Sequence, residues 1–163
     1  MPTITSITPA FAVTGVLRPE DIAAAPGLGF RSIISNLPDG EQAAAPTAGR
    51  EADLAAAAGL GFRHIPATKF DVLSDEVIGQ MDQALRTLEG PVLAHCASGI
   101  RSAVVWAGAA AQVQPVDCVL ATLREAGIDL SRIREELEAR NAASDAPAEL
   151  PPALDCACDR RSA

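Results

Sequence analysis

Aromatic side chains are nearly absent from this sequence of 163 residues: they make up 3% of it, with one tryptophan and no tyrosine. Proteins that bind single-stranded nucleic acids stack bases on aromatic rings, and proteins that bind duplexes present a basic face. This chain has 13 Lys and Arg against 21 Asp and Glu, which gives a net charge of -8. The composition therefore argues against a nucleic-acid partner.

Long apolar runs are also missing. Nothing in the sequence approaches the roughly 18 consecutive apolar residues of a membrane span, and the first residues show no basic region followed by an apolar run. We therefore expect no membrane partner and, by default, a cytoplasmic location. Only four cysteines occur, at positions 96, 118, 156 and 158. They are too sparse for a disulfide framework, which fits a reducing compartment.

The apolar content of 48% is enough to bury the core of one domain, which we expect over residues 1–140. Residues 141–163 are rich in Ala, Ser, Asp and Pro without periodicity, which predicts a flexible tail. Cys156 and Cys158 lie in this tail, where they would receive sulfur, bind a metal with outside help, or have no role. Two ligands do not make a zinc site, so we expect neither a metal nor a cofactor. Cys118 is predicted to lie opposite the apolar face of its helix, without a function.

Hydrophobic periodicity and turn residues predict alternating strands and helices. The expected strands are at 11–15, 32–35, 92–94 and next to His64, and the expected helices at 18–25, 51–58, 74–88 and 102–112, with further apolar helix faces at 116–123 and 130–137. The run Gly-Leu-Gly-Phe-Arg occurs at 27–31 and again at 59–63. We interpret this repeat as two helix-to-strand junctions of a βαβ pattern.

The most informative stretch is residues 91–102, Pro-Val-Leu-Ala-His-Cys-Ala-Ser-Gly-Ile-Arg-Ser. A short apolar strand there ends on Cys96, and the small residues that follow let the backbone curl so that its N–H groups point at one spot. A helix that starts near Ser102 would add free N–H groups and the positive end of its dipole. This predicts an anion-binding loop that favours a nucleophilic thiolate at Cys96; the loop residues are Ala97, Ser98, Gly99, Ile100 and Ser102.

Three neighbours of Cys96 have expected roles. Arg101 would grip an oxyanion bidentately, and Ser102 would donate its hydroxyl to the sulfur. His95 is better placed to orient the loop than to act as a base. The alternative is an inert buried cysteine, which is common on strands. We favour a reactive site because the strand end, the cysteine, the loop, the arginine and the serine occur together in the right order.

Two stretches resemble the small bacterial phosphatase-like domain family that is also found fused to metallo-β-lactamase-like dioxygenase domains. One is His-Cys-x-Ser-Gly-x-Arg-Ser at 95–102, and the other is residues 29–41, which end in a Pro-Asp-Gly-Glu turn. The resemblance covers residues from about 4 to 127. It implies an α/β, cysteine-phosphatase fold of the dual-specificity type, with a mostly parallel central sheet flanked by helices. It leaves open whether a separately encoded dioxygenase of that kind is a partner.

The spacing within the motif bears on the reaction. Protein tyrosine phosphatases place five residues between Cys and Arg, whereas Cys96 and Arg101 are separated by four, so the loop has one amide fewer for the oxygens of a phosphoryl group. Rhodanese-type sulfurtransferases, on a different fold, also use four. By this analogy we expect a sulfurtransferase that passes sulfane sulfur from a small donor to a thiol acceptor through a Cys96 persulfide. The alternatives are a phosphatase of phosphomonoesters that forms a phosphocysteine, and a non-enzymatic redox or anion sensor.

A phosphatase would also need a general acid to protonate its leaving group. The candidate is Asp71, between an expected strand and an expected helix, although members of the resembling family commonly lack an acid there. His64 is interpreted as a satisfied core histidine rather than a residue that points at the loop. Three further polar residues are expected to form a turn near the active end of the sheet: Asn36, Asp39 and Glu41.

Overall fold

The structure is a computed structural model, and it describes residues 2–158. In chain order its elements are β1 (Thr5–Thr8), β2 (Phe11–Thr14), α1 (Pro19–Ala24), the 3-10 turn η1 (Ala25–Leu28), β3 (Ser32–Ser35), α2 (Ala48–Ala57), β4 (Gly61–His64), α3 (Asp75–Thr87), β5 (Val92–His95), α4 (Ile100–Ala111), α5 (Val116–Glu125), η2 (Ser131–Ile133), α6 (Arg134–Ala143) and η3 (Pro152–Leu154).

The strands form one sheet in the order β1-β2-β5-β3-β4. Only β1 and β2 pair antiparallel, and the other pairs are parallel. The central strand is β5, whose last residue, His95, pairs with Thr14 of β2 and Ser35 of β3. The carboxyl ends of these three strands therefore meet at one edge of the sheet, which is called the carboxyl edge below. The predicted mostly parallel α/β fold is confirmed.

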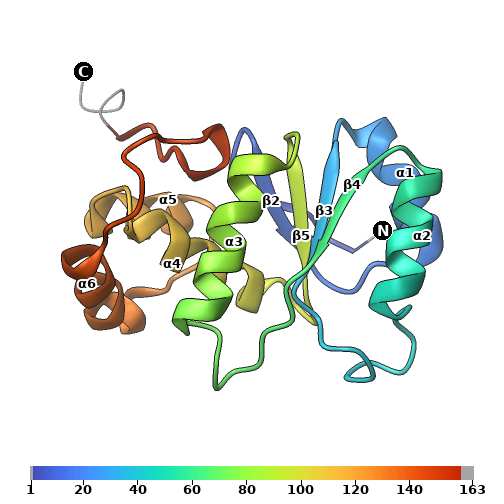
Figure 1. The fold of residues 1–163 in the computed structure, drawn as a ribbon, viewed down its shortest axis with the longest axis horizontal. Helices are drawn as coiled ribbons and strands as arrows, with labels where there is room; N and C mark the ends of the chain where they lie inside the picture. The colour runs from blue at the N-terminus through green and yellow to red at the C-terminus, as the bar shows by residue number, and fades with distance from the viewer. Residues whose placement is uncertain (1, 159–163) are drawn as a thin grey trace.

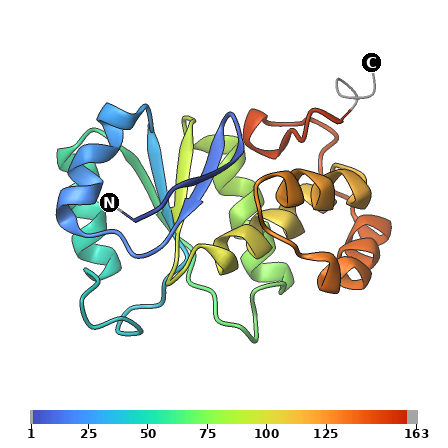
Figure 2. The same cartoon turned by 180° about the vertical axis from the view of Figure 1, so that it is seen from behind.

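Helices cover both faces of the sheet (Figures 1 and 2): α1 and α2 lie on one face, and α3, α4, α5 and α6 lie on the other. Successive residues of a strand point to opposite faces, so β5 serves two cores. Leu93 packs in the smaller core under α1 and α2, whereas Val92 and Ala94 belong to the larger core on the opposite face. A strand buried on both faces reads as a continuous apolar run, as the sequence shows.

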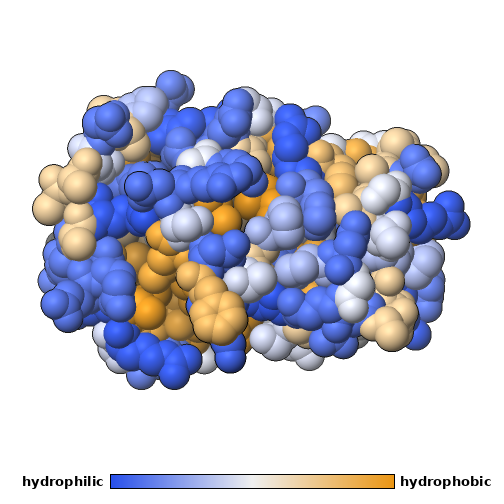
Figure 3. Space-filling view, turned by 60° about the horizontal axis from the view of Figure 1, so that its bottom comes forward, coloured by the Kyte–Doolittle hydropathy of each residue, from blue (hydrophilic) through white to orange (hydrophobic). Residues whose placement is uncertain are grey.

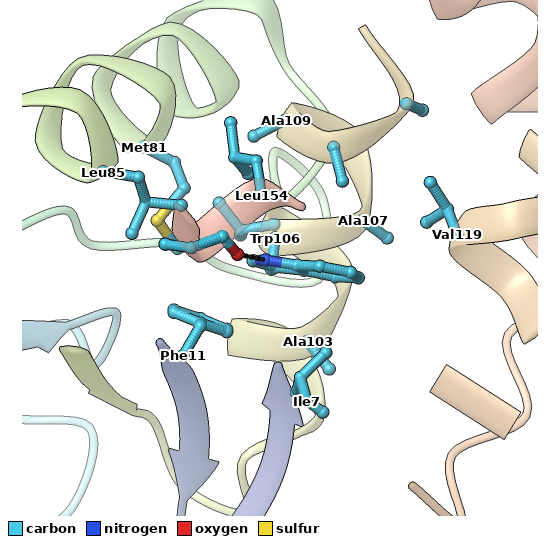
Figure 4. Close-up of a cluster of buried hydrophobic side chains, with 14 of the residues drawn as sticks. Ile7, Phe11, Met81, Leu85, Ala103, Trp106, Ala107, Ala109, Val119 and Leu154 are labelled. Atoms are coloured by element: carbon cyan, nitrogen blue, oxygen red, sulfur yellow. Dashed lines mark hydrogen bonds between the residues drawn. The ribbon is translucent and has the colours of Figure 1, made fainter. Parts of the chain in front are cut away.

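The larger core centres on Trp106 of α4 (Figure 4). Its ring stacks on Phe11 with centroids 6.0 Å apart. Its indole N–H donates a hydrogen bond of 2.8 Å to the carbonyl of Ala153, so the one polar atom of the ring is satisfied. Met81 of α3 is fully buried in the same cluster. Both residues therefore fill the core, as the sequence predicted.

The described part of the expected tail packs against this core. Leu154 is fully buried and Cys156 is 1% exposed. The backbone N–H of Cys156 also donates to the side chain of Gln114 over 3.2 Å. Residues 144–158, named the C-terminal segment below, thus cover one end of α4. The domain boundary at residue 140 stays a prediction, and α6 runs through it to Ala143.

The interpretation of Cys118 was wrong. Its side chain is 8% exposed, and a disulfide joins it to Cys158. Periodicity assigned it to the polar side of α5, but this helix is packed against α4, α6 and β1, and the C-terminal segment approaches it as well. A helix covered on several sides has no solvent-facing stripe at such a position.

Two further differences concern local structure. Strand β1 was not predicted; it lengthens the sheet beyond β2. Helix α2 begins at Ala48, three residues earlier than expected, because the hydroxyl of Thr47 accepts a hydrogen bond of 3.3 Å from the N–H of Arg50 and caps the helix. Of the helices in residues 2–158, none combines the length and the apolar character that crossing a membrane would require.

Candidate active site

Strand β5 delivers Cys96 to the carboxyl edge, and α4 starts four residues later. The Cys96 side chain is fully buried, and its sulfur accepts a hydrogen bond of 3.1 Å from the N–H of Gly99. Gly99 has a φ of 91°, and a Cβ there would lie 3.3 Å from the carbonyl oxygen of Thr14. Both facts require glycine at this position, since other residues rarely adopt a positive φ. The loop therefore aims one amide at the sulfur.

Other N–H groups of the loop have no acceptor among the residues that the structure describes. They belong to four residues around the start of α4: Ala97, Ser98, Arg101 and Ser102. The N–H of Ile100 is used locally, since it donates to the hydroxyl of Ser98 over 3.4 Å. Free amides at a helix start, together with the positive end of its dipole, are suited to bind an anion. The predicted anion-binding loop therefore has the donors it needs.

Buried polar atoms without a hydrogen-bond partner gather at this edge. Within the described residues they include Oγ of Ser102, Nδ1 of His95 and Oδ1 of Asn36. The predicted bond from Ser102 to the sulfur is thus not formed in this structure. The other two such atoms, on Asp82 and Thr122, lie in α3 and α5. Most buried polar groups in proteins are paired, so the three unpaired atoms at the carboxyl edge are suited to bind something further.

Arg101 lies in the first turn of α4, and its side chain is held by two connections of the chain, the one between β3 and α2 and the one between β4 and α3. Its Nη1 donates to Glu41 over 3.0 Å and to the carbonyl of Ala67 over 2.7 Å, and its Nη2 donates to the other oxygen of Glu41. The hydrogen bond with Glu41 raises the pKa of Arg101; burial opposes this shift, and the charges of Cys96 and Glu41 add to it. The guanidinium therefore stays protonated and lies within electrostatic reach of Cys96.

His95 is tied to α2 by a buried pair. Its Nε2 lies 2.8 Å from Oε2 of Glu51, and the side chains are 0% and 2% exposed. Its backbone carbonyl also accepts a hydrogen bond of 2.8 Å from the N–H of Asn36. A side chain fixed in this way cannot move far, and it holds the strand residue that precedes Cys96. The orienting role expected for His95 stays a prediction.

Asp71, the candidate acid, is exposed in the connection between β4 and α3. Its Oδ1 accepts hydrogen bonds from the N–H and the hydroxyl of Thr68, at 2.6 Å and 3.0 Å. No hydrogen bond joins it to Cys96 or Arg101 in the part of the chain that is described. A role as general acid stays a prediction.

The remaining polar candidates hold the surrounding turns. Nε2 of His64 lies 2.9 Å from the carbonyl of Leu37, and Nδ2 of Asn36 donates to the carbonyl of Ile65 over 2.9 Å. Asp39 accepts a hydrogen bond of 2.7 Å from the N–H of Ala48 at the start of α2. These contacts link the ends of β3, β4 and α2. They fit the turn chemistry expected for Asn36 and Asp39. Glu41 instead binds the guanidinium of Arg101.

Two large apolar side chains are exposed at this edge. Phe70, in the β4–α3 connection, is 88% exposed, and Ile100, in the Cys loop, is 42% exposed. The ammonium of Lys69 lies 5.1 Å from the centroid of the Phe70 ring. Figure 3 views the molecule from this end, where hydrophobic surface gathers in one area bordered by hydrophilic side chains. In residues 2–158, no three His, Cys, Asp or Glu side chains converge to hold a metal ion.

Sequence reasoning missed three contributors to the site: Glu51, Ala67 and the role of Glu41 with Arg101. Glu41 lies in the Pro-Asp-Gly-Glu turn that already stood out in the sequence, so its place near the loop had a signal. Glu51 had none, because a glutamate in the first turn of an alanine-rich helix is usual on an exposed surface. Ala67 contributes only its backbone carbonyl, which no side-chain pattern reveals.

Comparison with known sequences identifies the family to which the chain is similar. Residues 3–113 match the family described as "Beta-lactamase hydrolase-like protein, phosphatase-like domain". A curated relative, the Beta-lactamase hydrolase-like protein of Xylella fastidiosa strain Temecula1, is 34% identical over 104 residues; the same match is found in strain 9a5c. The match covers 64% of this chain and 24% of the relative, so the chain spans about a quarter of the length of these proteins.

Solved structures agree with the fold. A candidate phosphatase from Neisseria meningitidis Z2491 superposes with a TM-score of 0.71 at 29% identity, and the match covers 84% of this chain and 97% of that one. A second candidate phosphatase, from Shewanella putrefaciens CN-32, has a TM-score of 0.64 at 18% identity, covering 88% and 93%. The kinase-associated phosphatase, with its catalytic cysteine replaced by serine, has a TM-score of 0.61 at 17% identity, covering 88% and 96%. The predicted cysteine-phosphatase fold is therefore confirmed.

Proposed function

We propose that this chain, which belongs to the phosphatase-like domain family of the beta-lactamase hydrolase-like proteins, is a sulfurtransferase that carries sulfane sulfur on Cys96. The donor would be a small persulfide or thiosulfate, and the acceptor a thiol. Support comes from the four-residue spacing between Cys96 and Arg101, which leaves the loop one amide short of the tyrosine-phosphatase pattern.

The proposed reaction has two displacement steps. In the first, the Cys96 thiolate attacks the outer sulfur of the donor; a new S–S bond forms, the donor S–S bond breaks, and the donor leaves as a thiolate or as sulfite. In the second, an acceptor thiolate attacks the outer sulfur of the Cys96 persulfide. The sulfur passes to the acceptor, and Cys96 is released as a thiolate. No oxidant, reductant or cofactor is consumed.

Chain residues would stabilise the charges in these steps. The N–H of Gly99, at 3.1 Å from the sulfur, stabilises negative charge on Cys96 itself. The free amides at the start of α4 and the guanidinium of Arg101 would hold the anionic end of the donor and, after transfer, the outer sulfur of the persulfide. His95 and Glu51 keep the residue before the nucleophile in place.

The observation that carries the proposal is the contrast between this anion-binding loop and the candidate acid. The loop has amide donors without an acceptor in the described residues, but Asp71 Oδ1 accepts two hydrogen bonds, both from Thr68 within its own turn. Transfer of sulfur between thiolates needs stabilisation of negative charge and no strong acid. Hydrolysis of a phosphomonoester needs a proton for the leaving group.

The test is turnover of thiosulfate or glutathione persulfide by the wild-type chain and by Cys96→Ser. We expect sulfur transfer in the wild type, none in Cys96→Ser, and, by intact-mass analysis, one extra sulfur atom on the wild-type chain after incubation with donor alone. Peptide mapping should place that atom on Cys96 and not on Cys156, which is also a buried cysteine. A wild type without transfer and without the added sulfur would refute the proposal.

A phosphatase is the second candidate, because the similar solved structures are described as phosphatases. It predicts release of phosphate from an aryl phosphate that disappears in Cys96→Ser. It also predicts that Asp71→Asn lowers this rate by about 10²- to 10⁴-fold, the usual contribution of a general acid. Sulfur transfer should change less than about threefold in Asp71→Asn, since a substitution that removes no needed proton has a small effect. The two substrates and this one variant therefore separate the candidates.

A further inference from the structure

Large apolar side chains are rarely exposed in residues 2–158, and two of them lie close to the Cys loop. The exposed ones are Leu28, Phe70 and Ile100, with exposed fractions of 56%, 88% and 42%. Single exposed apolar side chains are common on proteins and need no explanation. Two of them at one site, from separate parts of the chain, do need one.

Phe70 and Ile100 reach this site by different routes. Ile100 lies in the Cys loop itself, directly before Arg101. Phe70 lies in the β4–α3 connection, which is joined to Arg101 by the hydrogen bond of 2.7 Å to the carbonyl of Ala67. Phe70 follows Ala67 by three residues, so the Cα atoms of the two are at most about 10 Å apart. The two apolar side chains therefore lie near the same arginine.

The turn that presents Phe70 is held by its own hydrogen bonds. The N–H of Phe70 donates to the hydroxyl of Thr68 over 3.2 Å, and the N–H of Asp71 donates to the carbonyl of Thr68 over 3.3 Å. The carboxylate of Asp71 closes the same turn by accepting from the N–H of Thr68 over 2.6 Å. A turn tied in this way holds the ring in water, where apolar surface is unfavourable. A ligand can therefore pack on this ring without first having to order the backbone.

The charges around Phe70 and the size of the surface indicate what packs there. Lys69 and Asp71 flank Phe70 with opposite charges, so the turn attracts neither cations nor anions strongly. A complete phenylalanine side chain buries about 150 to 250 Å². Two partly exposed side chains thus offer far less than the roughly 800 Å² that each partner contributes to a stable protein interface. The surface suits one ring or one alkyl chain better than a protein.

We propose that Phe70 and Ile100 bind the apolar body of a ligand whose anionic head enters the Cys loop. The ligand class is then a small organic anion: a thiosulfonate or a persulfide with an aryl or alkyl group next to the reacting sulfur. This deepens the proposed function by naming the class of donor, and it rests on that function only for the sulfur at the head. Thiosulfate, which has no apolar group, would fill only the Cys loop.

The experiment compares two unreactive anions, methanesulfonate and benzenesulfonate, which share a head and differ in the body. Each is titrated into the full chain and followed by the NMR signals of the Gly99 N–H and of the Phe70 ring, which is identified by its loss in Phe70→Ala. We expect benzenesulfonate to bind roughly threefold to tenfold more tightly, the range for one aromatic pair. Benzenesulfonate should shift both signals, whereas methanesulfonate should shift mainly that of Gly99.

Substitutions locate the origin of this preference. Phe70→Ala should lower the affinity for benzenesulfonate to that for methanesulfonate, and Ile100→Ala should remove part of the difference. Phe70→Leu keeps apolar surface without a ring and should retain part of it. The matched control is Leu28→Ala, which truncates the third exposed apolar side chain, just before β3 at the opposite edge of the sheet. This control should keep the full preference.

Equal affinities of the wild type for the two sulfonates, or a full preference that persists in Phe70→Ala, would overturn the inference. So would a Phe70 ring signal that benzenesulfonate does not move, which is the result expected if the surface serves a protein partner. Sulfonates carry no sulfane sulfur, so their binding is measured apart from turnover. An aryl preference without sulfur transfer by the wild type would refute the proposed function and leave this inference standing. Sulfur transfer from thiosulfate without an aryl preference would do the reverse.

Discussion

Two segments of this chain, residues 36–51 and the C-terminal segment, lie at opposite edges of the sheet and are held by different kinds of contact. Residues 36–51 reach the carboxyl edge through two carboxylates: Glu41 binds Arg101, and Glu51 binds His95. The C-terminal segment is held by burial of Leu154, by hydrogen bonds such as the one from Trp106 to the carbonyl of Ala153, and by the disulfide between Cys158 and Cys118. The first segment is anchored by pairs of charged or titratable side chains, whereas the second is anchored by apolar burial, hydrogen bonds to its backbone and a disulfide.

The second segment lies at the edge where the parallel strands begin. Pro152 and Ala153 line a cavity of about 250 Å³ together with Ala10 and Pro91, which come just before β2 and β5. The carboxyl edge thus keeps its polar groups in place without filling the site with apolar side chains. The opposite edge does not have to position the polar groups of the site, and there buried apolar surface closes the core.

The largest expected effect on stability is the loss of the buried charge anchor. Glu51→Ala should lower the free energy of unfolding by about 3 to 5 kcal/mol, because it leaves His95 buried without its partner. Urea denaturation measures this change. In the molecules that remain folded, we also expect slower alkylation of Cys96 by iodoacetamide, since the loop loses its support.

Two variants sharpen this result. Glu51→Gln keeps a hydrogen bond to His95 and should cost less than Glu51→Ala. Asp53→Ala removes an exposed carboxylate from the same helix and should change stability by no more than about 0.5 kcal/mol. A Glu51→Ala variant as stable as Asp53→Ala would show that the buried pair does not anchor residues 36–51.

Breaking the apolar anchor should have a somewhat smaller effect on stability and none on chemistry. Leu154→Ala should cost about 2 to 5 kcal/mol, the range for truncating a fully buried leucine. Its rate of sulfur transfer per folded molecule should equal that of the wild type. Glu149→Ala, on the exposed part of the same segment, is the control for stability. A lower rate of sulfur transfer in folded Leu154→Ala would mean that the two edges are coupled. This outcome would contradict the separate anchoring of the two segments.

The smallest effect concerns a second buried carboxylate, on the same face of the sheet as Glu51. Asp21 is buried in α1 and accepts a hydrogen bond of 2.9 Å from the N–H of Arg18. Burial tends to raise the pKa of Asp21, but the hydrogen bond from Arg18 and nearby positive charge outweigh it and hold the pKa below 3.8. The folded state therefore favours the ionised form.

A depressed pKa adds stability that is present above the unfolded value and is lost as the pH falls through the folded value. Asp21→Asn should therefore cost about 1 kcal/mol at pH 7, typical for one helix-capping interaction. The difference from the wild type should shrink once the pH drops below 3.8, the unfolded value. Thermal melts from pH 7 down to pH 3 measure it, and a difference that grows toward low pH would contradict the assigned direction.

The features predicted correctly from the sequence are those that depend on neighbours in the chain. The strand Val92–His95, the helix that follows the loop, and the helix capped by Ser74 follow from apolar spacing and from single capping residues. The motif that contains the loop, residues 95–102, spans eight consecutive residues. Its curl, its amides and its glycine are fixed within that stretch, so residue types alone indicated an anion-binding loop.

The features that were missed depend on contacts between distant residues. Glu51 and His95 are 44 residues apart, and Glu41 and Arg101 are 60 apart. The disulfide joins cysteines separated by 40 residues, so the isolated pattern around Cys118 placed it on the wrong side of its helix. From the sequence alone, several carboxylates could equally have been the partners of His95 and Arg101. Only the folded sheet brings two of them to the carboxyl edge.

The sequence by itself determined the candidate nucleophile, the loop around it and the alternation of strands and helices, because local backbone geometry and apolar periodicity specify these. The tertiary structure alone decided which carboxylates hold His95 and Arg101, and what covers α4 and α5. The physical reason is that such pairs form only after strands from distant parts of the chain align in register, and no short stretch of sequence contains that information.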